Sequence, residues 1–140
     1  MLNCAKKFIK SNDLRLGEAI EIDEKEKYDA VISNGVFPYF LDYEYAKKVL
    51  NKMYEKSENV IAILDIFDIN KKEEFITYRR HIVENYDEKY KDLNKLFFSK
   101  DFFIKFAEEK NMDIKFSKAN IEKYYNDKFV FDCYLYKKIR

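Results

Sequence analysis

Short apolar runs alternate along the chain with longer segments in which apolar residues recur every three or four positions. Five consecutive apolar residues at 60–64 predict a strand, and a nearly continuous apolar run at 28–33 predicts a strand buried on both faces of a sheet. The alternation at 112–116 and the long run at 129–136 predict two strands near the end of the chain. A shorter alternation at 14–16 predicts one more strand near its start.

Helical periodicity fills the segments between these runs. The segment 2–9 repeats apolar residues at helical spacing and stops at a polar stretch, so it predicts the end of a helix. Asp42 precedes an apolar stripe and is expected to cap a helix, and Asn70 opens a capping-box sequence for the next one. Ser99 or Asp101 is expected to cap a phenylalanine-rich helix.

The order of these elements predicts an α/β fold. Strands that alternate with helices indicate a mostly parallel sheet covered by helices on both faces. The last two strands follow each other without a helix, so we expect them to form an antiparallel C-terminal pair. No linker, repeat or low-complexity stretch divides the chain, and residues 1–140 are expected to form a single domain.

Composition excludes some classes of protein. Of the 140 residues, 47% are hydrophobic and 18% aromatic, which excludes a disordered tail. The net charge is only +1, whereas nucleic-acid-binding proteins gather a basic surplus on one face. The 12 Tyr and 13 Phe could stack on bases, but most fall on the apolar stripes, where core packing explains them first. We therefore expect no nucleic-acid partner.

The cysteines and the chain start bear on the cellular compartment. Cys4 and Cys133 lie almost a chain length apart, so we expect unpaired, buried residues of a reducing cytoplasm, with a single disulfide as the alternative. The first residues contain no apolar stretch of signal-peptide length, and the longest apolar run is far too short to cross a bilayer. The chain is expected to be cytoplasmic, without a membrane partner.

Two features limit the ligands that the chain can bind. Its 2 Gly residues, Gly17 and Gly35, cannot build a glycine-rich phosphate loop. Asp65 and Asp68 follow the strongest predicted strand, but two carboxylates without a histidine or further acids are typical of strand ends and helix caps. We expect no metal site.

Two strings in the first third of the chain carry a resemblance to a known family. The string LRLGEA at 14–19, followed after about ten residues by YDAVISNGVFPYF at 28–40, resembles the middle of class I S-adenosylmethionine-dependent methyltransferases. In that family a short strand ends in a Gly-acidic-Ala turn, a strand beginning Phe/Tyr-Asp follows, and a loop with an aromatic pair leads into a helix. Residues 60–65 resemble the next strand, and the closing pair resembles the family's reversed C-terminal hairpin. The resemblance implies a Rossmann-like methyltransferase sheet.

The chain departs from that family before Leu14. The family's first strand, its G-x-G-x-G loop and the acidic residue that ends its second strand should all precede this point. Here thirteen residues precede Leu14, and none of them is glycine. We therefore expect the C-terminal portion of the fold, truncated on its N-terminal side and dependent on a separately supplied donor-binding half. The strand between Ala30 and Ser33 would then be an open edge, available for self-association or a partner chain.

The resemblance also implies which residues contact the methyl donor. Glu18 matches the acidic position that in the family lies near the adenine amino group. The residues assigned to S-adenosylmethionine on this basis are Gly17, Glu18, Ala19, Asn34, Gly35, Val36 and Phe37. The alternatives are that Gly17 and Glu18 are ordinary turn residues, and that Val36 and Phe37 pack under the next helix.

Methyl transfer to oxygen or nitrogen can require the acceptor to lose a proton, and Tyr39 and His81 are the candidate acid/base residues. His81 is the only histidine, but it follows two arginines on a polar helix, where a solvated residue is the alternative. The expected function is S-adenosylmethionine-dependent methylation of a small-molecule acceptor. The alternative is a non-catalytic remnant or partner-binding module that pairs through its open sheet edge.

Overall fold

The structure, a computed structural model, describes residues 2–10, 13–93 and 95–139. In chain order its helices and strands are α1 (Leu2–Phe8), β1 (Tyr28–Asn34), α2 (Tyr43–Lys56), β2 (Ser57–Phe67), α3 (Lys72–Ile82), α4 (Tyr86–Lys89), α5 (Lys100–Glu109), β3 (Met112–Ser117) and β4 (Val130–Lys137). Short 3-10 helices lie between them: η1 (Ala19–Glu21), η2 (Phe37–Tyr39), η3 (Ile69–Lys71) and η4 (Asp127–Phe129). The predicted α/β class and four of the five predicted strands are therefore confirmed.

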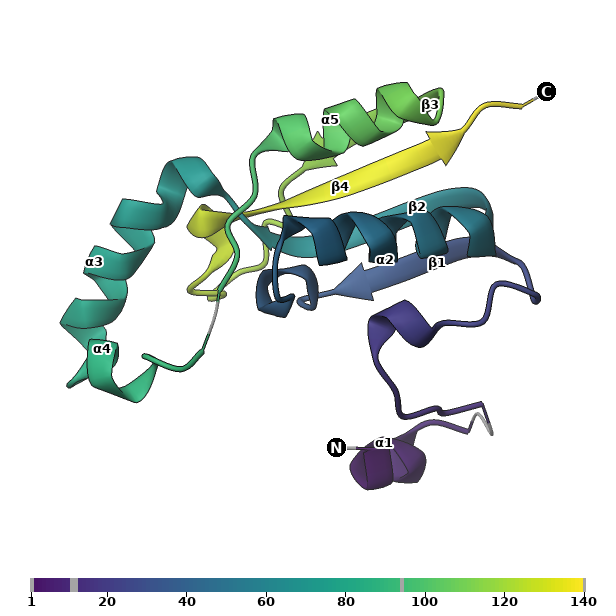
Figure 1. The fold of residues 1–140 in the computed structure, drawn as a ribbon. Helices are drawn as coiled ribbons and strands as arrows, with labels where there is room; N and C mark the ends of the chain where they lie inside the picture. The colour runs from purple at the N-terminus through teal and green to yellow at the C-terminus, as the bar shows by residue number, and fades with distance from the viewer. Residues whose placement is uncertain (1, 11–12, 94, 140) are drawn as a thin grey trace.

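The strands form one sheet in the order β1-β2-β4-β3 (Figure 1). β1 runs parallel to β2, whereas β4 is antiparallel to both β2 and β3. The predicted antiparallel pair at the C-terminal end is thus confirmed, and the prediction of a mostly parallel sheet is wrong for the described residues. The fifth predicted strand does not form, since residues 13–16 have no regular structure. A short alternation cannot make a strand where no neighbouring strand pairs with it.

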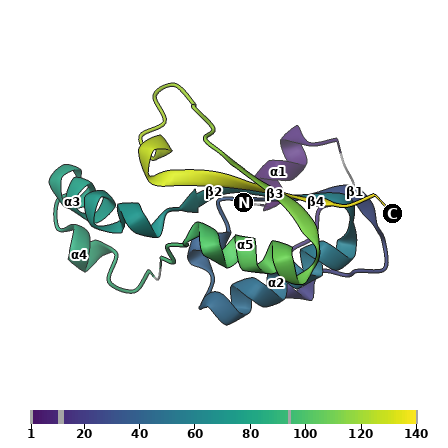
Figure 2. The same cartoon turned by 90° about the horizontal axis from the view of Figure 1, so that it is seen from above.

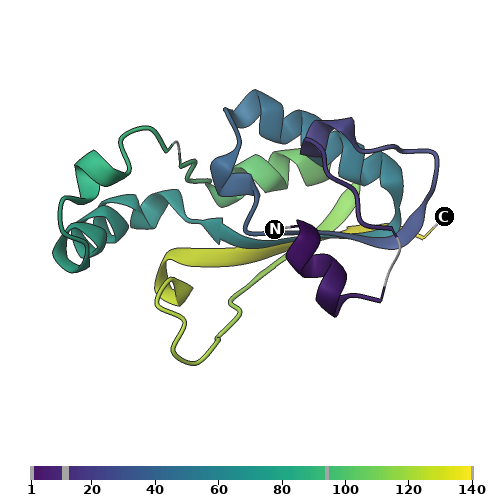
Figure 3. The same cartoon turned by 90° about the horizontal axis from the view of Figure 1, so that it is seen from below.

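Helices α2 and α5 lie on the same face of the sheet (Figures 2 and 3). Beneath them, one row of paired residues crosses all the strands: Val31, Ile61, Leu135 and Ile114. Large aromatic side chains, among them Phe37, Phe98 and Phe103, fill the space between this row and the helices. This is the main core of the molecule.

The opposite face is exposed at the two edge strands, β1 and β3, so the prediction of helices that cover both faces is wrong for this part of the described sheet. The next row of paired residues, which faces away from α2 and α5, is Ile32, Ala62, Tyr134 and Lys115. Ile32 is 64% exposed, so β1 is not buried on both faces as its apolar run predicts. Helix α1 lies on this side of the sheet (Figure 3), but its Phe8 is 86% exposed and does not pack there.

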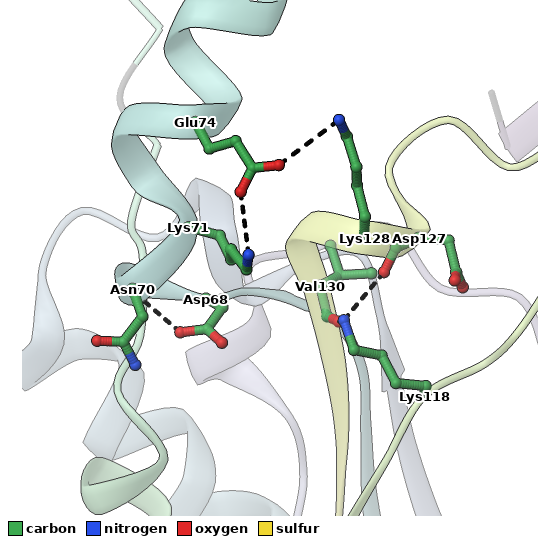
Figure 4. A network of polar contacts seen from close by, with 8 residues as sticks. All are labelled: Asp68, Asn70, Lys71, Glu74, Lys118, Asp127, Lys128 and Val130. Carbon is green, nitrogen blue, oxygen red and sulfur yellow. Dashed lines mark hydrogen bonds and ion pairs between the residues drawn. The ribbon is translucent and has the colours of Figure 1, made fainter.

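A second, smaller core joins α3 to the sheet. It consists of Phe67, Phe75, Phe97, Phe129 and Val130. Figure 4 shows the polar contacts around it: the Glu74 carboxylate of α3 lies 3.0 Å from the Lys71 amine and 3.6 Å from the Lys128 amine. The Lys118 amine donates to the main-chain oxygen of Val130 at 2.7 Å. The Glu74–Lys128 pair links α3 to the end of the loop between β3 and β4.

Side-chain caps begin both α2 and η3. Asp42 accepts a hydrogen bond from the main-chain N–H of Tyr45 at 2.7 Å, as predicted. The predicted cap at Asn70 is wrong, because η3 precedes α3 and Asp68 caps it by accepting from the Asn70 N–H at 2.9 Å. Ser99 occupies the predicted N-cap position of α5, although its side chain makes no capping hydrogen bond.

The two cysteines are free but differ in their surroundings. Cys133 lies in the main core, where burial raises the pKa of its thiol to about 12. Cys4 is exposed, contrary to expectation, because α1 does not pack against the sheet. In the part of the chain that the structure describes, every helix is too short or too polar to cross a bilayer.

Candidate functional site

A groove of about 870 Å³ lies beside β1, between the segment 13–23 and the turn at η2. Five of the nine predicted site residues line it: Gly17, Glu18, Ala19, Val36 and Tyr39. They belong to two segments that are separated along the chain by β1. The structure therefore brings together the two strings that carry the resemblance.

Local hydrogen bonds hold the first of these segments in place. The main-chain N–H of Glu18 donates to Oε2 of Glu21 at 2.9 Å, within a capping box that opens η1. Gly17 permits this close packing, since a Cβ there would lie 3.1 Å from the same oxygen. The Tyr45 hydroxyl of α2 donates to Oε2 of Glu18 at 3.3 Å. Glu18 is thus tied to α2 through one oxygen while its side chain remains exposed at the groove.

The groove combines apolar surface with carboxylates. Val31, Val36 and Phe40 contribute apolar side chains, and Glu18 and Glu21 contribute acidic ones. Apolar surface next to a few hydrogen-bond acceptors suits a ligand that carries a flat ring and N–H donors. The acids also favour a ligand with positive charge.

The two basic side chains that line the groove are already engaged. The Lys56 amine donates to the main-chain oxygens of Asp23, at 2.5 Å, and Glu26, at 3.0 Å. Arg15 forms an ion pair with Asp13 at 2.8 Å. Both cations therefore serve to hold the groove's own segment, and neither is directed at an anionic ligand.

Asn34 and Gly35 lie at the carboxyl end of β1, next to the groove but outside its lining. Gly35 has a φ of 65°, in the left-handed region that favours glycine, and its N–H donates to the Leu64 carbonyl at 3.0 Å. A Cβ at Gly35 would lie 3.6 Å from Oδ2 of Asp65. The glycine thus shapes the turn that leads from β1 into η2.

The remaining two predicted residues lie elsewhere. Phe37 is fully buried, with its ring 4.9 Å from that of Phe40 and 5.9 Å from that of Phe98. Its side chain belongs to the main core, in agreement with the packing alternative. His81 lies in the last turn of α3, which extends away from the sheet and from η1 (Figure 1). His81 is exposed there and does not line the groove.

A polar cluster that the sequence does not reveal lies on β2. The pairing of β2 with β4 is irregular between Ile63 and Ile66, and Asp65 within this bulge has a φ of 63°. Its N–H donates to Oδ1 of Asp132 at 2.9 Å, and the Tyr124 hydroxyl lies 2.7 Å from both of its carboxylate oxygens. Burial and this hydrogen bond raise the pKa of Tyr124 to about 12, so the hydroxyl remains a donor.

The carboxylates after the expected end of β2 have structural roles. β2 continues past Asp65, which was expected to end it, and Asp68 caps η3. No group of three or more His, Cys, Asp or Glu side chains that could hold a metal ion occurs within residues 2–10, 13–93 and 95–139.

Lys95 is a second residue that the sequence does not distinguish from the other basic residues. Its amine lies 5.7 Å from the ring centre of Tyr39, at the groove, and 4.3 Å from that of Phe67. Burial lowers the pKa of Lys95 to about 8, the charge of Arg79 lowers it too, and the charge of Asp65 opposes the shift. Only the folded chain brings these residues together.

Known structures resemble this fold, although no family model matches the chain and no curated protein matches its sequence. Magnesium protoporphyrin IX methyltransferase (ChlM) from Synechocystis PCC 6803, with bound SAH, matches with a TM-score of 0.59 at 10% identity, over 87% of this chain and 49% of that one. A possible exported protein from Bordetella parapertussis matches with a TM-score of 0.61 at 12% identity, over 88% of this chain and 43% of that one. The small RNA methyltransferase HEN1 matches with a TM-score of 0.55 at 13% identity, over 89% of this chain and 15% of that one. The chain has a methyltransferase-like fold.

These matches cover most of this chain but a smaller share of the others. The chain spans about half of the ChlM chain and less of the other two. At 10–13% identity the likeness shows the fold and does not assign roles to residues. The methyltransferase-like fold agrees with the resemblance of the strings at 14–19 and 28–40.

Proposed function

We propose that this chain takes part in S-adenosylmethionine-dependent methyl transfer and that the groove beside β1 forms one wall of the donor site. The observation that carries the proposal is the convergence of Gly17, Glu18, Ala19, Val36 and Tyr39 on a single groove. The methyltransferase-like fold supports the same reaction class at the level of the fold.

The groove suits the adenosine part of the donor. Val31 and Val36 would contact the adenine ring, and the exposed carboxylate of Glu18 would accept a hydrogen bond from its amino group. The donor, when bound, supplies a methyl group on a positively charged sulfur. The chain's part is to hold donor and acceptor in line and to favour the charge that disperses during transfer.

The opposite wall of the donor site would come from a polypeptide segment that pairs with the free edge of β1. Among the described strands, β1 pairs with β2 alone. In doubly wound sheets the ligand lies outside the carboxyl ends of the strands, at the point where the strand order reverses. A strand added beside β1 would create that point next to the groove. This proposal accounts for a donor groove without a glycine-rich loop.

Tyr39 is the residue that we propose for proton transfer at the acceptor. It lines the groove and is 52% exposed, so an acceptor can reach its hydroxyl. His81, the other predicted acid/base residue, is distant from this groove and has no part in the proposed reaction.

Equilibrium dialysis of the chain against S-adenosylmethionine tests the proposal. We expect measurable binding at millimolar donor and about tenfold weaker binding for Glu18→Gln, which loses a charge-assisted hydrogen bond. Glu44→Gln is the matched control, because Glu44 is an exposed acid of α2 outside the groove. Absence of binding at millimolar donor, or equal losses in the two variants, would contradict the assigned donor site.

The free edge of β1 favours a second candidate, a partner-binding module without catalysis. Its supporting observation is that β1 presents both an unpaired edge among the described strands and the exposed side chain of Ile32. Size-exclusion chromatography over a range of concentrations separates the two candidates. Concentration-dependent association together with no donor binding would favour the module over the methyltransferase.

A further inference from the structure

A second, smaller cavity of about 180 Å³ lies between α3, α4 and the segment after α4. Its lining includes Arg79, Tyr86, Asp87, Tyr90, Lys91 and Lys95. Sites that enclose a whole drug-sized ligand typically measure roughly 300–1,000 Å³. A cavity of this size suits one small group of a larger molecule.

The charges around this cavity are not balanced. The Asp87 carboxylate pairs with Arg80 at 3.0 Å, and the Lys91 amine pairs with a glutamate of α4 at 2.7 Å. Arg79 and Lys95, by contrast, form no ion pair with any described residue. The cavity therefore keeps two cations that form no ion pair with a described residue.

Arg79 is held in position but retains an unused donor. Its guanidinium carbon lies 5.7 Å from the ring centre of Tyr86 and 5.6 Å from that of Tyr90, and Nη2 donates to the Tyr90 hydroxyl at 3.3 Å. Its Nε is buried and has no hydrogen-bond partner among the described residues. Burial raises the pKa of Tyr86, so this phenol stays neutral and does not balance the charge. Arg79 lines the cavity, so an anionic group bound there would lie beside a guanidinium that still has a donor to satisfy.

Lys95 lines the same cavity. Its amine is half-buried above aromatic rings, and the groups that act on it electrostatically are Arg79 and Asp65. Burial and, to a smaller extent, repulsion from Arg79 lower its pKa to about 8, which still leaves the amine mostly charged at pH 7. An anion between the two cations would remove this repulsion.

We propose that Arg79 and Lys95 bind a small anionic group, a carboxylate or a phosphate, and that this group belongs to the methyl acceptor. The second part rests on the proposed function. It follows from the position of Lys95, which lines the cavity and whose amine also lies 5.7 Å from the ring centre of Tyr39, at the donor groove. An acceptor held by its anionic group in the cavity would extend past Lys95 and present its reactive atom near Tyr39. The planar guanidinium of Arg79 suits either oxyanion.

Titrations of the whole chain, followed by NMR without any donor, test the anion site. Sodium phosphate and, separately, sodium acetate are added at pH 7 and constant ionic strength, so that the two probes distinguish a phosphorylated from a carboxylated acceptor. Arg79→Gln and Lys95→Met each remove one cation from the cavity. Lys89→Met is the matched control, because Lys89 is an exposed lysine of α4 that does not line the cavity.

We expect saturable shifts around the cavity with at least one probe, about tenfold weaker binding in each cavity variant, and unchanged binding in Lys89→Met. No saturable shift with either probe, or an equal loss in Lys89→Met, would overturn the anion site. Anion binding that depends on Arg79 and Lys95 in a chain that never binds the donor would support the site and overturn its assignment to a methyl acceptor. Where both bind, donor and anion must bind together, and mutual exclusion would overturn that assignment too.

Discussion

The two faces of the sheet are built from the same strands but differ in what covers them. On the face beneath α2 and α5, Ile61 and Leu135 are 0% exposed. On the other face the neighbouring row begins with Ile32, 64% exposed, and ends with the exposed Lys115. Since side chains alternate along a strand, each strand contributes to both faces. The covered face therefore determines the stability of the fold, and the uncovered face with the edge of β1 is left for interactions with another segment.

The largest expected change in the free energy of unfolding comes from a substitution in the core on the covered face. Phe98→Ala removes a fully buried ring that lies 5.2 Å from Phe102, 5.4 Å from Tyr43 and 5.9 Å from Phe37. We expect the free energy of unfolding to fall by about 3–5 kcal/mol, because the ring's contacts are lost and a cavity remains. Urea unfolding measures this change, with Phe8→Ala on the exposed helix α1 as the matched control.

The control is expected to change the free energy of unfolding by no more than about 0.5 kcal/mol. Similar losses in Phe98→Ala and Phe8→Ala would contradict the difference between the two regions. Such a result would mean that α1 packs against the sheet as firmly as α5 does.

The covered face was largely predictable from the sequence. Residues 60–64 are a continuous apolar run and Asp42 precedes a regular apolar stripe, so propensity and burial agree there. The wrong predictions concern apolar patterns whose structure depends on a neighbouring strand or helix, which the pattern itself does not specify. The alternation at 14–16 forms no strand without a partner strand, and the run at 28–33 predicts burial although no described element covers Ile32. An apolar pattern indicates what is suited to burial and not what lies above it.

The candidate site was predictable only in part, for a related reason. Glu18 and Val36 could be placed together because the resemblance gives the order of two strand ends. Arg79, Lys95 and Tyr124 come from segments far from these strings and belong to residue types that occur throughout the chain. Their contacts, of Lys95 with Arg79 and of Tyr124 with Asp65, depend on how these segments pack together, which no local pattern encodes.

A smaller effect is expected for the polar cluster on β2. The loop between β3 and β4 extends to the uncovered side of the sheet (Figures 2 and 3), and its Tyr124 hydroxyl binds the Asp65 carboxylate at 2.7 Å. Tyr124→Phe should lower the free energy of unfolding by about 1–2 kcal/mol, because a half-buried carboxylate loses its donor. The neighbouring Tyr125→Phe is the control, since Tyr125 is exposed. If the two variants unfold at the same urea concentration, the hydrogen bond does not hold the loop.

Lys95→Met should raise the free energy of unfolding, whereas the preceding variants lower it. The folded state holds the Lys95 amine at a pKa of about 8, below the 10.5 of an ordinary lysine, so its charge destabilises the fold at pH 7. We expect the variant to be more stable at pH 7 by the order of 1 kcal/mol, reduced from the full pKa shift because the side chain is partly solvated. Thermal unfolding at fixed ionic strength measures the difference.

The lowered pKa of Lys95 also predicts how the stability of the wild type changes with pH. Below pH 8 the amine is charged in both states, so the destabilisation is fully present and constant. Between about pH 8 and pH 10.5 the unfolded chain binds more protons than the folded one, so stability rises with pH in the wild type. The rise should be smaller in Lys95→Met. Parallel pH profiles for the two proteins would show that the charge of Lys95 does not oppose folding.

The smallest effect on stability is expected on the uncovered face. Ile32→Lys places a charge at an exposed position of the edge strand and should change the free energy of unfolding by no more than about 0.5 kcal/mol. The same charge should prevent strand pairing at this edge, so any self-association of the wild type seen by sedimentation velocity should weaken in the variant. A large loss of stability would mean that the chain's own residues cover Ile32. Unchanged association would mean that copies of the chain meet at another surface, and that the edge of β1 is not where a second segment binds.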